Sequence, residues 1–302
     1  MAKNNQAKVV AIVGPTASGK TTLSLELAKL FNGEIISADS RQVYQGLNIG
    51  TEKITPAEMA GVPHHLIDVC LPERQYTALD FKTDAEALVQ SITERGRLPI
   101  IVGGTFFYID AWLGRVSLPE VAPNQDLRKR LEEKSTAELQ AELVKIDSER
   151  AATIDTANRR RLIRAIEIGQ ALGRVPPSPP LKPTHQVLSF GLKTDRDDLL
   201  RKIHERAKEA LKKGLVEETK SLLVGGLSKE RLNEIGLEYR LVIEHLDGLY
   251  DEKTLLRKIS EKNWQYAKRQ LTWLKKDPEI KWFNPGEVAN IIDVVKGFIN
   301  EK

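Results

Sequence analysis

Only one cysteine, Cys70, occurs among the 302 residues of the sequence. An intramolecular disulfide and a cysteine-based metal site are therefore both excluded. Long apolar runs are missing as well. None approaches the roughly 20 residues that a membrane-spanning helix needs, and the first eight residues are mostly polar. These absences predict a cytoplasmic protein in a reducing environment, with no membrane partner.

An excess of charge of one sign is also lacking, since 46 lysine and arginine residues oppose 42 aspartate and glutamate residues and leave a net charge of +4. A nucleic-acid partner can therefore be inferred only from places where basic residues cluster, not from the total. What is present is an ordinary globular composition, with 41% hydrophobic residues to form a core. The length allows one large domain or two modest ones, at roughly 150 residues per domain.

The first third of the chain alternates short apolar segments with segments of helical periodicity. Buried strands are predicted at 9–13, 34–38, 65–69 and 99–102, and helices after positions 19 and 104 and at 78–95. Such alternation is typical of an α/β fold, in which helices cover both faces of a parallel sheet. Ligands of these sheets bind beyond the carboxyl ends of the strands.

The character of the sequence changes after Leu118. Residues 126–172 are charged and helical in pattern, and the proline-rich segment 175–180 is expected to be a stiff linker. We therefore predict an all-helical insertion domain at 119–182, carried by an α/β core made of 1–118 and 183–302. Within the second part of the core we expect a strand at 186–192, helices at 195–276 and a final helix at 288–299.

The first predicted strand runs into Gly14-Pro15-Thr16-Ala17-Ser18-Gly19-Lys20-Thr21, which matches the phosphate-binding loop (P-loop) pattern of ATP-binding and other nucleotide-binding proteins. Its glycines let the backbone wrap a phosphate, and the backbone N–H groups with the helix N-terminus attract the anion. Lys20 supplies a positive charge, and Thr21 can place its hydroxyl on a phosphate-bound Mg²⁺. The loop predicts a diphosphate-bearing ligand without identifying it. No guanine-reading Asn-Lys-x-Asp motif is present, and only Leu66-Ile67-Asp68 resembles the acidic strand of an NTPase.

Polar residues follow the second and fourth predicted strands directly. Asp39-Ser40-Arg41-Gln42 follows the second, so Asp39 should lie near the phosphate loop, where it can bind Mg²⁺ through water or accept a proton. Gln42 carries both a donor and an acceptor and can pair with adenine through both. A capping Asp-Ser turn with a surface glutamine explains the same residues. Thr105, after Gly103-Gly104, is placed either to cap the next helix or to aim its hydroxyl into the same crevice.

Two further clusters allow a functional and a plain structural interpretation. His64 and His65 are adjacent in an extended segment and point to opposite faces, so a hydrogen-bonded structural role is favoured over a shared metal. Arg160 and Arg164 share one face of a predicted helix, and a basic stripe runs along 253–276. Basic stripes suit a phosphate backbone, although a solvated amphipathic helix has the same pattern.

Taken in order, these motifs resemble the tRNA dimethylallyltransferase family. The resemblance rests on the phosphate loop, Asp39-Ser40-Arg41-Gln42, Gly50-Thr51-x-Lys53, Pro63-His64-His65-Leu66-Ile67-Asp68, Gly103-Gly104-Thr105, Arg160-Arg161-Leu162-Ile163-Arg164 and Lys268-Arg269-Gln270-x-Thr272-Trp273. It covers nearly the whole chain. The zinc finger of eukaryotic relatives is not found within it, so the resemblance is to the bacterial type.

The resemblance implies transfer of a dimethylallyl group from dimethylallyl diphosphate to N6 of the adenosine after the anticodon, position 37 of tRNA, with release of diphosphate. Residues 14–21 would bind the diphosphate, with Thr21 as ligand of a Mg²⁺ cofactor. Asp39 would accept the proton, and Thr105 and Arg128 match positions tied to the tRNA or to the catalytic step. Residues 39–42 and 160–164 would contact the anticodon loop of tRNA, and the enzyme is expected to be a monomer. A target base has to be extruded before it can react.

One segment departs from the family pattern, because Gly236-Leu237-Glu238-Tyr239-Arg240 has two extra residues after its glycine. No late arginine is therefore assigned to the diphosphate. Three other functions remain open on the residues alone. They are a P-loop kinase of a small metabolite or nucleotide, a prenyltransferase acting on free AMP, ADP or ATP, and a non-catalytic RNA-binding protein.

Overall fold

The computed structural model describes residues 6–116, 118–177 and 184–301. Five residues of the polar N-terminal segment and positions 178–180 of the proline-rich segment lie outside this range. The chain divides into two compact units. The core unit consists of Met1–Leu113 with Lys182–Lys302, and the helical unit is Gly114–Leu181. No described helix combines the length and the apolar character needed to cross a bilayer.

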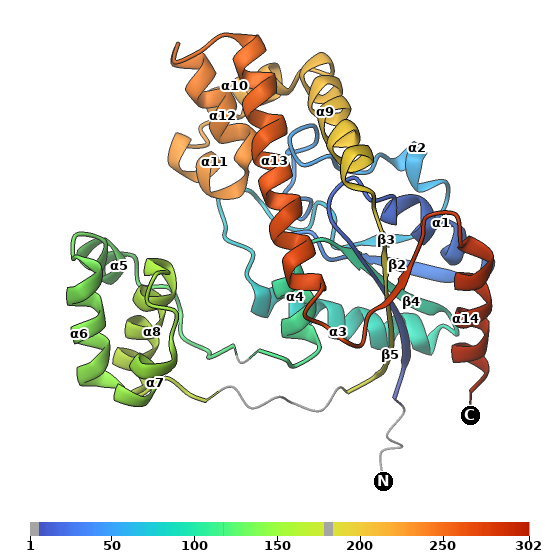
Figure 1. Cartoon of the computed structure of the whole chain (residues 1–302), viewed down its shortest axis with the longest axis horizontal. Coiled ribbons are helices and arrows are strands. Elements are labelled where there is room, and N and C mark those ends of the chain that lie inside the picture. The colour runs from blue at the N-terminus through green and yellow to red at the C-terminus, as the bar shows by residue number, and fades with distance from the viewer. Residues whose placement is uncertain (1–5, 117, 178–183, 302) are drawn as a thin grey trace. The chain divides into compact units, whose positions relative to one another are not determined.

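One parallel sheet organises the core unit (Figure 1). Its strands are β1 Lys8–Val13, β2 Gly33–Ser37, β3 His64–His65, β4 Leu98–Gly103, β5 Gln186–Leu192 and β6 Lys281–Phe283. They lie in the order β3-β2-β4-β1-β5-β6, and every pair is parallel. The predicted α/β fold with a parallel sheet is confirmed. β1 lies at the centre, so the phosphate loop that follows it opens at the middle of the sheet edge.

Helices cover both faces of the sheet. On one face α1, Lys20–Leu30, and α14, Val288–Asn300, pack on a shared apolar cluster that includes Ile12 and Phe190. Alternate strand residues such as Ile36 point to the other face. There α3, Ala78–Glu94, contacts β2 and β4, and α4, Phe106–Trp112, packs on α3. Since both faces are covered, all of β2 and all of β1 after Lys8 are buried, as the sequence pattern predicted.

A second group of helices follows β5. It comprises α9 Arg196–Lys212, α10 Leu215–Val224, α11 Lys229–Ile235, α12 Leu237–Leu246 and α13 Glu252–Leu274. α13 packs against α9, α12 and α4. Ala17 of the phosphate loop is buried against Leu199 and Ile203 of α9 and Ala267 of α13. Helices α9 and α13 therefore pack directly against the phosphate loop.

The helical unit has its own core. Its helices are α5 Gln125–Glu132, α6 Thr136–Ile146, α7 Ser148–Thr153 and α8 Arg159–Leu172. Leu131, Leu139, Leu143 and Leu162 are all buried in one cluster. Side-chain caps from Asn124, Ser135, Asp147 and Asn158 begin these helices, so each short helix has a local start signal.

The chain leaves the core unit and returns to it at neighbouring points. Trp112 ends α4, just before the helical unit, and His185 precedes β5, just after it. The two rings stack with centroids 5.7 Å apart. Glu86 of α3 accepts a hydrogen bond from Trp112 Nε1 at 3.1 Å and is paired with His185 Nε2 at 2.9 Å.

Three elements differ from the sequence prediction. The third strand contains only His64–His65, because Leu66 and Asp68 take the left-handed conformation, with φ of 61° and 55°, which ends an extended segment. The short helix α2, Pro56–Met59, and the edge strand β6 were not predicted. Both are too short to show a clear period.

Candidate functional site

The phosphate loop joins β1 to α1 and has the geometry of an anion-binding turn. Gly19 precedes the helix with φ of 91°, a conformation that favours glycine. A Cβ at Gly14 would lie 2.7 Å from Ser18 Oγ, so the loop closes too tightly for a side chain there. The Ser18 hydroxyl is buried and makes no hydrogen bond with any residue that the structure describes. A buried, unpaired donor in this loop suits a bound phosphate oxygen.

Lys20 lies at the centre of the charged groups. Its Nζ donates a hydrogen bond to the Pro15 carbonyl at 2.6 Å. Burial, together with the nearby positive charge of Arg206, lowers the pKa of Lys20 to about 8. The carboxylates of Asp39 and Glu52 act in the opposite direction. Asp39 and Arg206 therefore both act electrostatically on the lysine of the phosphate loop.

Asp39 lies at the carboxyl end of β2 and is half-buried. Its Oδ1 accepts hydrogen bonds from the backbone N–H groups of Arg41, at 2.9 Å, and Gln42, at 3.3 Å. Its Oδ2 accepts none from the described part of the chain. One oxygen therefore fixes the turn, as the capping interpretation predicted, and leaves the other available as a base or a ligand.

Thr105 joins the ends of β2 and β4. It occupies the first position before α4 but makes no capping hydrogen bond, so the predicted capping role is wrong. Its Oγ1 accepts from the Ser40 backbone N–H at 3.0 Å and donates to Ser40 Oγ at 3.3 Å. A Cβ at Gly103 would lie 2.1 Å from the Ala38 carbonyl oxygen, so only glycine permits this approach of the strands. The predicted site residues of the two strand ends therefore meet.

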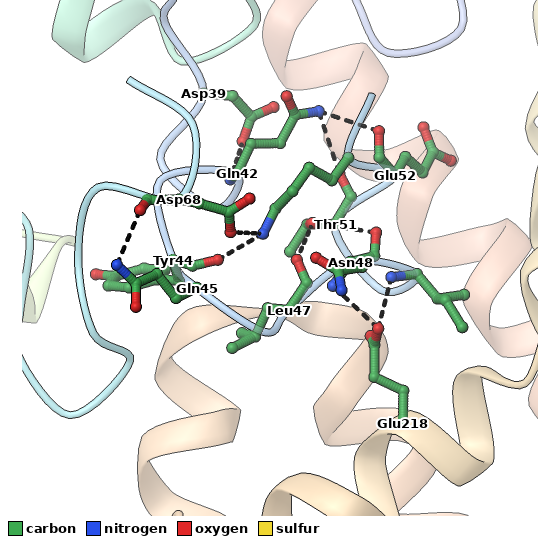
Figure 2. A network of polar contacts seen from close by, with 12 residues as sticks. Asp39, Gln42, Tyr44, Gln45, Leu47, Asn48, Thr51, Glu52, Asp68 and Glu218 are labelled. Carbon is green, nitrogen blue, oxygen red and sulfur yellow. Dashed lines mark hydrogen bonds and ion pairs between the residues drawn. The ribbon is translucent and has the colours of Figure 1, made fainter. Parts of the chain in front are cut away.

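The Gln42 side chain is already partly engaged. Figure 2 shows its amide nitrogen turned to the backbone carbonyl groups of Thr51 and Glu52. The distances are 3.4 Å and 3.1 Å. Because both amide hydrogens have acceptors, the predicted two-point pairing with adenine is not available to this conformation. Only the amide oxygen remains for a ligand.

Three residues that the sequence analysis did not assign to the site approach it from the second group of helices. Gln270 of α13 is buried, accepts from the Thr16 backbone N–H at 2.9 Å and donates to the Gly104 carbonyl at 2.9 Å. It thereby links the phosphate loop to the end of β4. Arg206 of α9 pairs with Glu52 beside Lys20. Tyr266 lies against Arg41, whose guanidinium carbon is 6.0 Å from the ring centroid. Gln270 belonged to a quoted motif, whereas Arg206 and Tyr266 had no distinctive local signal.

Residues 236–240, the segment that departs from the family pattern, contact the candidate site through Arg41. Glu238 of α12 is buried and pairs with Arg41, and Tyr239 donates to Glu218 at 2.8 Å. Burial alone would lower the pKa of Arg41, but the carboxylates of Glu238 and Asp39 raise it, so the guanidinium stays charged. Arg240 of the same segment pairs with Glu244 along its own helix, at 3.8 Å.

Other motif residues have structural partners. His65 Nε2 is 2.6 Å from Glu34 Oε2, and Arg95 and Arg97 pair with the same buried carboxylate. Asp68, the residue that resembled an NTPase aspartate, pairs with Lys53. Within the ranges that the structure describes, no group of three or more histidine, cysteine, aspartate or glutamate side chains is arranged to hold a metal ion.

Arg128 lies in the helical unit and is bound to Glu167. Two hydrogen bonds, from Nε at 2.9 Å and Nη2 at 2.8 Å, reach this buried carboxylate, which also accepts from Arg164. Burial raises the pKa of Glu167, but its hydrogen bonds from Arg128 and the Asn124 backbone more than reverse this and lower it below the ordinary value. The pair is a charged clamp between α5 and α8, so Arg128 and Arg164 have a structural role that the sequence did not reveal.

The predicted RNA-contacting segment of α8 splits into two kinds of residue. Leu162 and Ile163 are buried in the core of the helical unit, so a contact between their side chains and RNA is excluded in this fold. Arg160 and Arg161 are exposed, and Arg161 has only a distant ion pair with Asp155 at 3.8 Å. The surface that remains for RNA on this segment consists of these two arginines.

The basic stripe on α13 is also present in part. Gln265, Arg269, Thr272 and Lys276 are exposed, whereas Lys258 and Lys262 are half-buried. Trp273 is 40% exposed and donates to Asp110 of α4 at 3.0 Å.

Comparison with known proteins shows which family has this sequence. A family model described as IPP transferase matches residues 42–277. The chain is 39% identical to the tRNA dimethylallyltransferase of Thermomicrobium roseum, over 99% of this chain and 94% of the relative. It is 41% identical to that of Pediococcus pentosaceus, over 98% of each. These longer matches span the phosphate loop and Asp39, which precede the family model.

Solved structures give the same assignment. The tRNA isopentenylpyrophosphate transferase of Bacillus halodurans superposes with a TM-score of 0.73, at 38% identity and with 97% of each chain covered. A eukaryotic dimethylallyltransferase acting on tRNA superposes with a TM-score of 0.76, at 26% identity, over 92% of this chain and 74% of that one. With a matching family model and close relatives along nearly its whole length, the chain belongs to the IPP transferase family.

Proposed function

We propose that this chain is a prenyltransferase that moves a dimethylallyl group from dimethylallyl diphosphate to N6 of the adenosine after the anticodon, position 37 of tRNA. Relatives carry the name tRNA dimethylallyltransferase, and one solved relative is described as acting on tRNA. The observation within this chain that carries the proposal is Asp39, whose unengaged carboxylate oxygen lies within electrostatic range of the phosphate loop. The reaction would take place in the cytoplasm on a monomeric enzyme.

The charged groups suit the chemistry of allylic transfer. Residues 14–21 would hold the diphosphate through backbone N–H groups, the Ser18 hydroxyl and Lys20, with Arg206 beside them. As the bond between allylic C1 and the diphosphate oxygen breaks, negative charge grows on the diphosphate, and these donors stabilise it. N6 forms the new bond to C1, and Asp39 Oδ2 accepts the proton that N6 loses.

The donor set also suits a magnesium ion. The Thr21 hydroxyl lies on the first turn of α1, is exposed, and has no hydrogen-bond partner among the described residues. Hydroxyl and phosphate oxygens are the ligands that Mg²⁺ prefers. We propose that Thr21 holds Mg²⁺ with the diphosphate, where the ion would neutralise charge on the leaving group.

One assay separates this function from its alternatives. Purified protein is incubated with Mg²⁺, unmodified tRNA and radiolabelled dimethylallyl diphosphate, with AMP plus donor and ATP alone in parallel. Label in tRNA and none in AMP is the expected result. Label only in AMP would indicate a free-nucleotide prenyltransferase. ATP turnover without prenyl transfer would indicate a kinase, and binding of tRNA without any reaction would indicate an RNA-binding protein.

The lowered pKa of Lys20 predicts a pH dependence of donor binding. Protonated Lys20 is the form that binds diphosphate, and its pKa in the ligand-free enzyme is about 8. The dissociation constant of dimethylallyl diphosphate should therefore rise as pH increases above 8 and be flat below 7. Titration calorimetry between pH 6.5 and 9.5 measures it, with Lys20→Arg as the control that removes the slope. A wild-type enzyme with constant affinity across this range would contradict a role for the Lys20 charge.

Exposed arginines of α8 predict a salt effect. Changing Arg160 and Arg161 together to glutamate should weaken tRNA binding and flatten the dependence of log Kd on log salt by about 1.5, because about 0.7–0.9 counterions are released per phosphate contact. Arg164 is left intact because it pairs with Glu167. Changing Lys281 and Lys296, exposed residues of the core unit, to glutamate is the charge-matched control. An unchanged slope for the arginine variant would make this cluster ordinary surface.

A further inference from the structure

The carboxylate of Glu218, on α10, accepts four hydrogen bonds, three of them from the backbone of one loop of the core unit. Its carboxylate accepts hydrogen bonds from three consecutive backbone N–H groups, of Asn48 at 3.0 Å, Ile49 at 2.8 Å and Gly50 at 3.0 Å. It also accepts from the Tyr239 hydroxyl at 2.8 Å. Consecutive N–H groups that converge on one anion form a rigid nest. Figure 2 shows Glu218 inserted against this loop.

Further contacts fix the backbone conformation of the loop formed by residues 47–53 around the Glu218 carboxylate. The Thr51 hydroxyl donates to the Leu47 carbonyl at 2.6 Å. Glu52 has φ of 51°, which a non-glycine residue adopts only when its surroundings hold it there. A Cβ at Gly50 would lie 2.5 Å from the Tyr239 ring. Glu218 and Tyr239 together therefore define the path of residues 47–53.

That path determines which atom Gln42 presents. The carbonyl groups of Thr51 and Glu52 both face the Gln42 side chain, and two acceptors can be matched only by the amide nitrogen. The amide oxygen is consequently turned the other way, towards the carboxylate of Asp39 (Figure 2). Two acceptors that have no hydrogen-bond partner among the described residues, Gln42 Oε1 and Asp39 Oδ2, thus belong to one turn at the end of β2.

We propose that Glu218 is a positioning residue that, through residues 47–53, orients Gln42 so that its amide oxygen and Asp39 together accept the two hydrogens of the acceptor's exocyclic amine. The inference rests on the proposed function, because it assumes a base as acceptor. An amino group satisfies both oxygens, whereas a keto oxygen in the same place would face two acceptors and no donor. The pair therefore selects a 6-aminopurine and rejects a 6-ketopurine, and buried polar groups left unpaired are the physical basis of such selection.

Binding and kinetics together test the inference. Anticodon stem-loop RNAs that carry adenosine or inosine at the acceptor position are compared for affinity, so that selection is measured without turnover. Wild-type protein should bind the adenosine form at least about tenfold more tightly, since inosine would cover the two acceptors and leave them unpaired. Gln42→Leu should reduce this preference several-fold. Glu218→Gln should do the same, because an amide nitrogen in place of one carboxylate oxygen opposes the backbone N–H groups.

Control variants separate positioning from general stability. Glu218→Gln should lower kcat for the adenosine RNA about tenfold and leave the dissociation constant of dimethylallyl diphosphate unchanged. Glu217→Gln, the exposed neighbour on α10, should change neither. The double variant of Glu218 and Gln42 should lose no more preference than Gln42→Leu alone, since both act through one contact. If Glu218→Gln fails to fold, Tyr239→Phe takes its place. This variant removes a single hydrogen bond to Glu218 and should cause a smaller loss of the same preference.

The outcomes distinguish the two proposals. Wild-type protein that prenylates no RNA would overturn the proposed function. Wild-type protein that prenylates RNA, while Gln42→Leu keeps the full preference for adenosine, would overturn this inference alone. Additive losses in the double variant would likewise overturn it, because Glu218 would then act by another route.

Discussion

Asparagine in place of Asp39 should lower the turnover number by about two to four orders of magnitude, the range in which general bases contribute. Asparagine tests the role of the carboxylate more specifically than alanine does, for a structural reason. Asparagine Oδ1 can still accept the hydrogen bonds from the Arg41 and Gln42 backbones that form the turn, so only the free oxygen is replaced. The affinity for tRNA, measured by filter binding, should fall by less than about tenfold, because the base makes few of the phosphate contacts that dominate RNA affinity.

Two results would contradict this role. Full turnover of Asp39→Asn would exclude Asp39 as the proton acceptor. Loss of tRNA binding in step with turnover would make Asp39 an RNA contact. Asp293→Asn, which changes an exposed aspartate of α14 outside the candidate site, serves as the matched control. That variant should keep turnover within a few-fold of wild type.

Loss of the Lys20 ammonium should reduce kcat/KM for dimethylallyl diphosphate by about 10²–10³-fold, the usual cost of removing one donor that stabilises a developing anion. Lys20→Ala should raise the KM for the donor and lower turnover, while the KM for tRNA stays the same. Steady-state kinetics with each substrate varied in turn provides the measurement. Lys29→Ala, exposed on the last turn of the same helix, is the matched control.

The folding stability of Lys20→Ala should not fall with its activity. Burial lowers the pKa of this side chain, which means that the folded protein bears a cost for keeping it charged. Its removal should therefore leave the melting temperature equal to or above that of wild type. A variant with unchanged kinetics would exclude the phosphate loop from the reaction, whereas a variant with a lowered melting temperature would attribute the loss to the fold.

Local signals predicted the part of the site that lies at strand ends. The phosphate loop, Asp39 and Thr105 each follow an apolar strand directly, and the parallel sheet brings strand ends to one edge. The residues that hold them come from helices about 100 or more positions away in the chain, as Arg206, Glu218 and Gln270 do. No period or spacing in a single sequence links such positions, so their roles appeared only in the structure.

Hydrophobic periodicity does not identify the whole buried face of α13, for a related reason. The buried residues are Leu255, Ile259, Asn263, Ala267, Gln270 and Leu274. Two of them are polar, and Gln270 is polar because it binds the phosphate loop. A count of apolar residues alone therefore leaves out part of the buried face. Likewise the ion pairs of Arg128 and Arg164 could not be predicted from the sequence, because their partner, Glu167, is a buried charge that hydropathy patterns do not anticipate.

The stacked rings of Trp112 and His185 have a consequence for how this chain could vary. The polypeptide leaves and rejoins the core unit at one point, where Trp112, His185 and Glu86 hold the two chain segments together. A change in the length of the chain between Trp112 and His185 should therefore not shift β4 or β5. The intervening segment can be enlarged, trimmed or exchanged as a cassette while the strand ends that carry the reactive groups keep their register. Sequence changes between these two points can therefore accumulate without disturbing the chemistry at the strand ends.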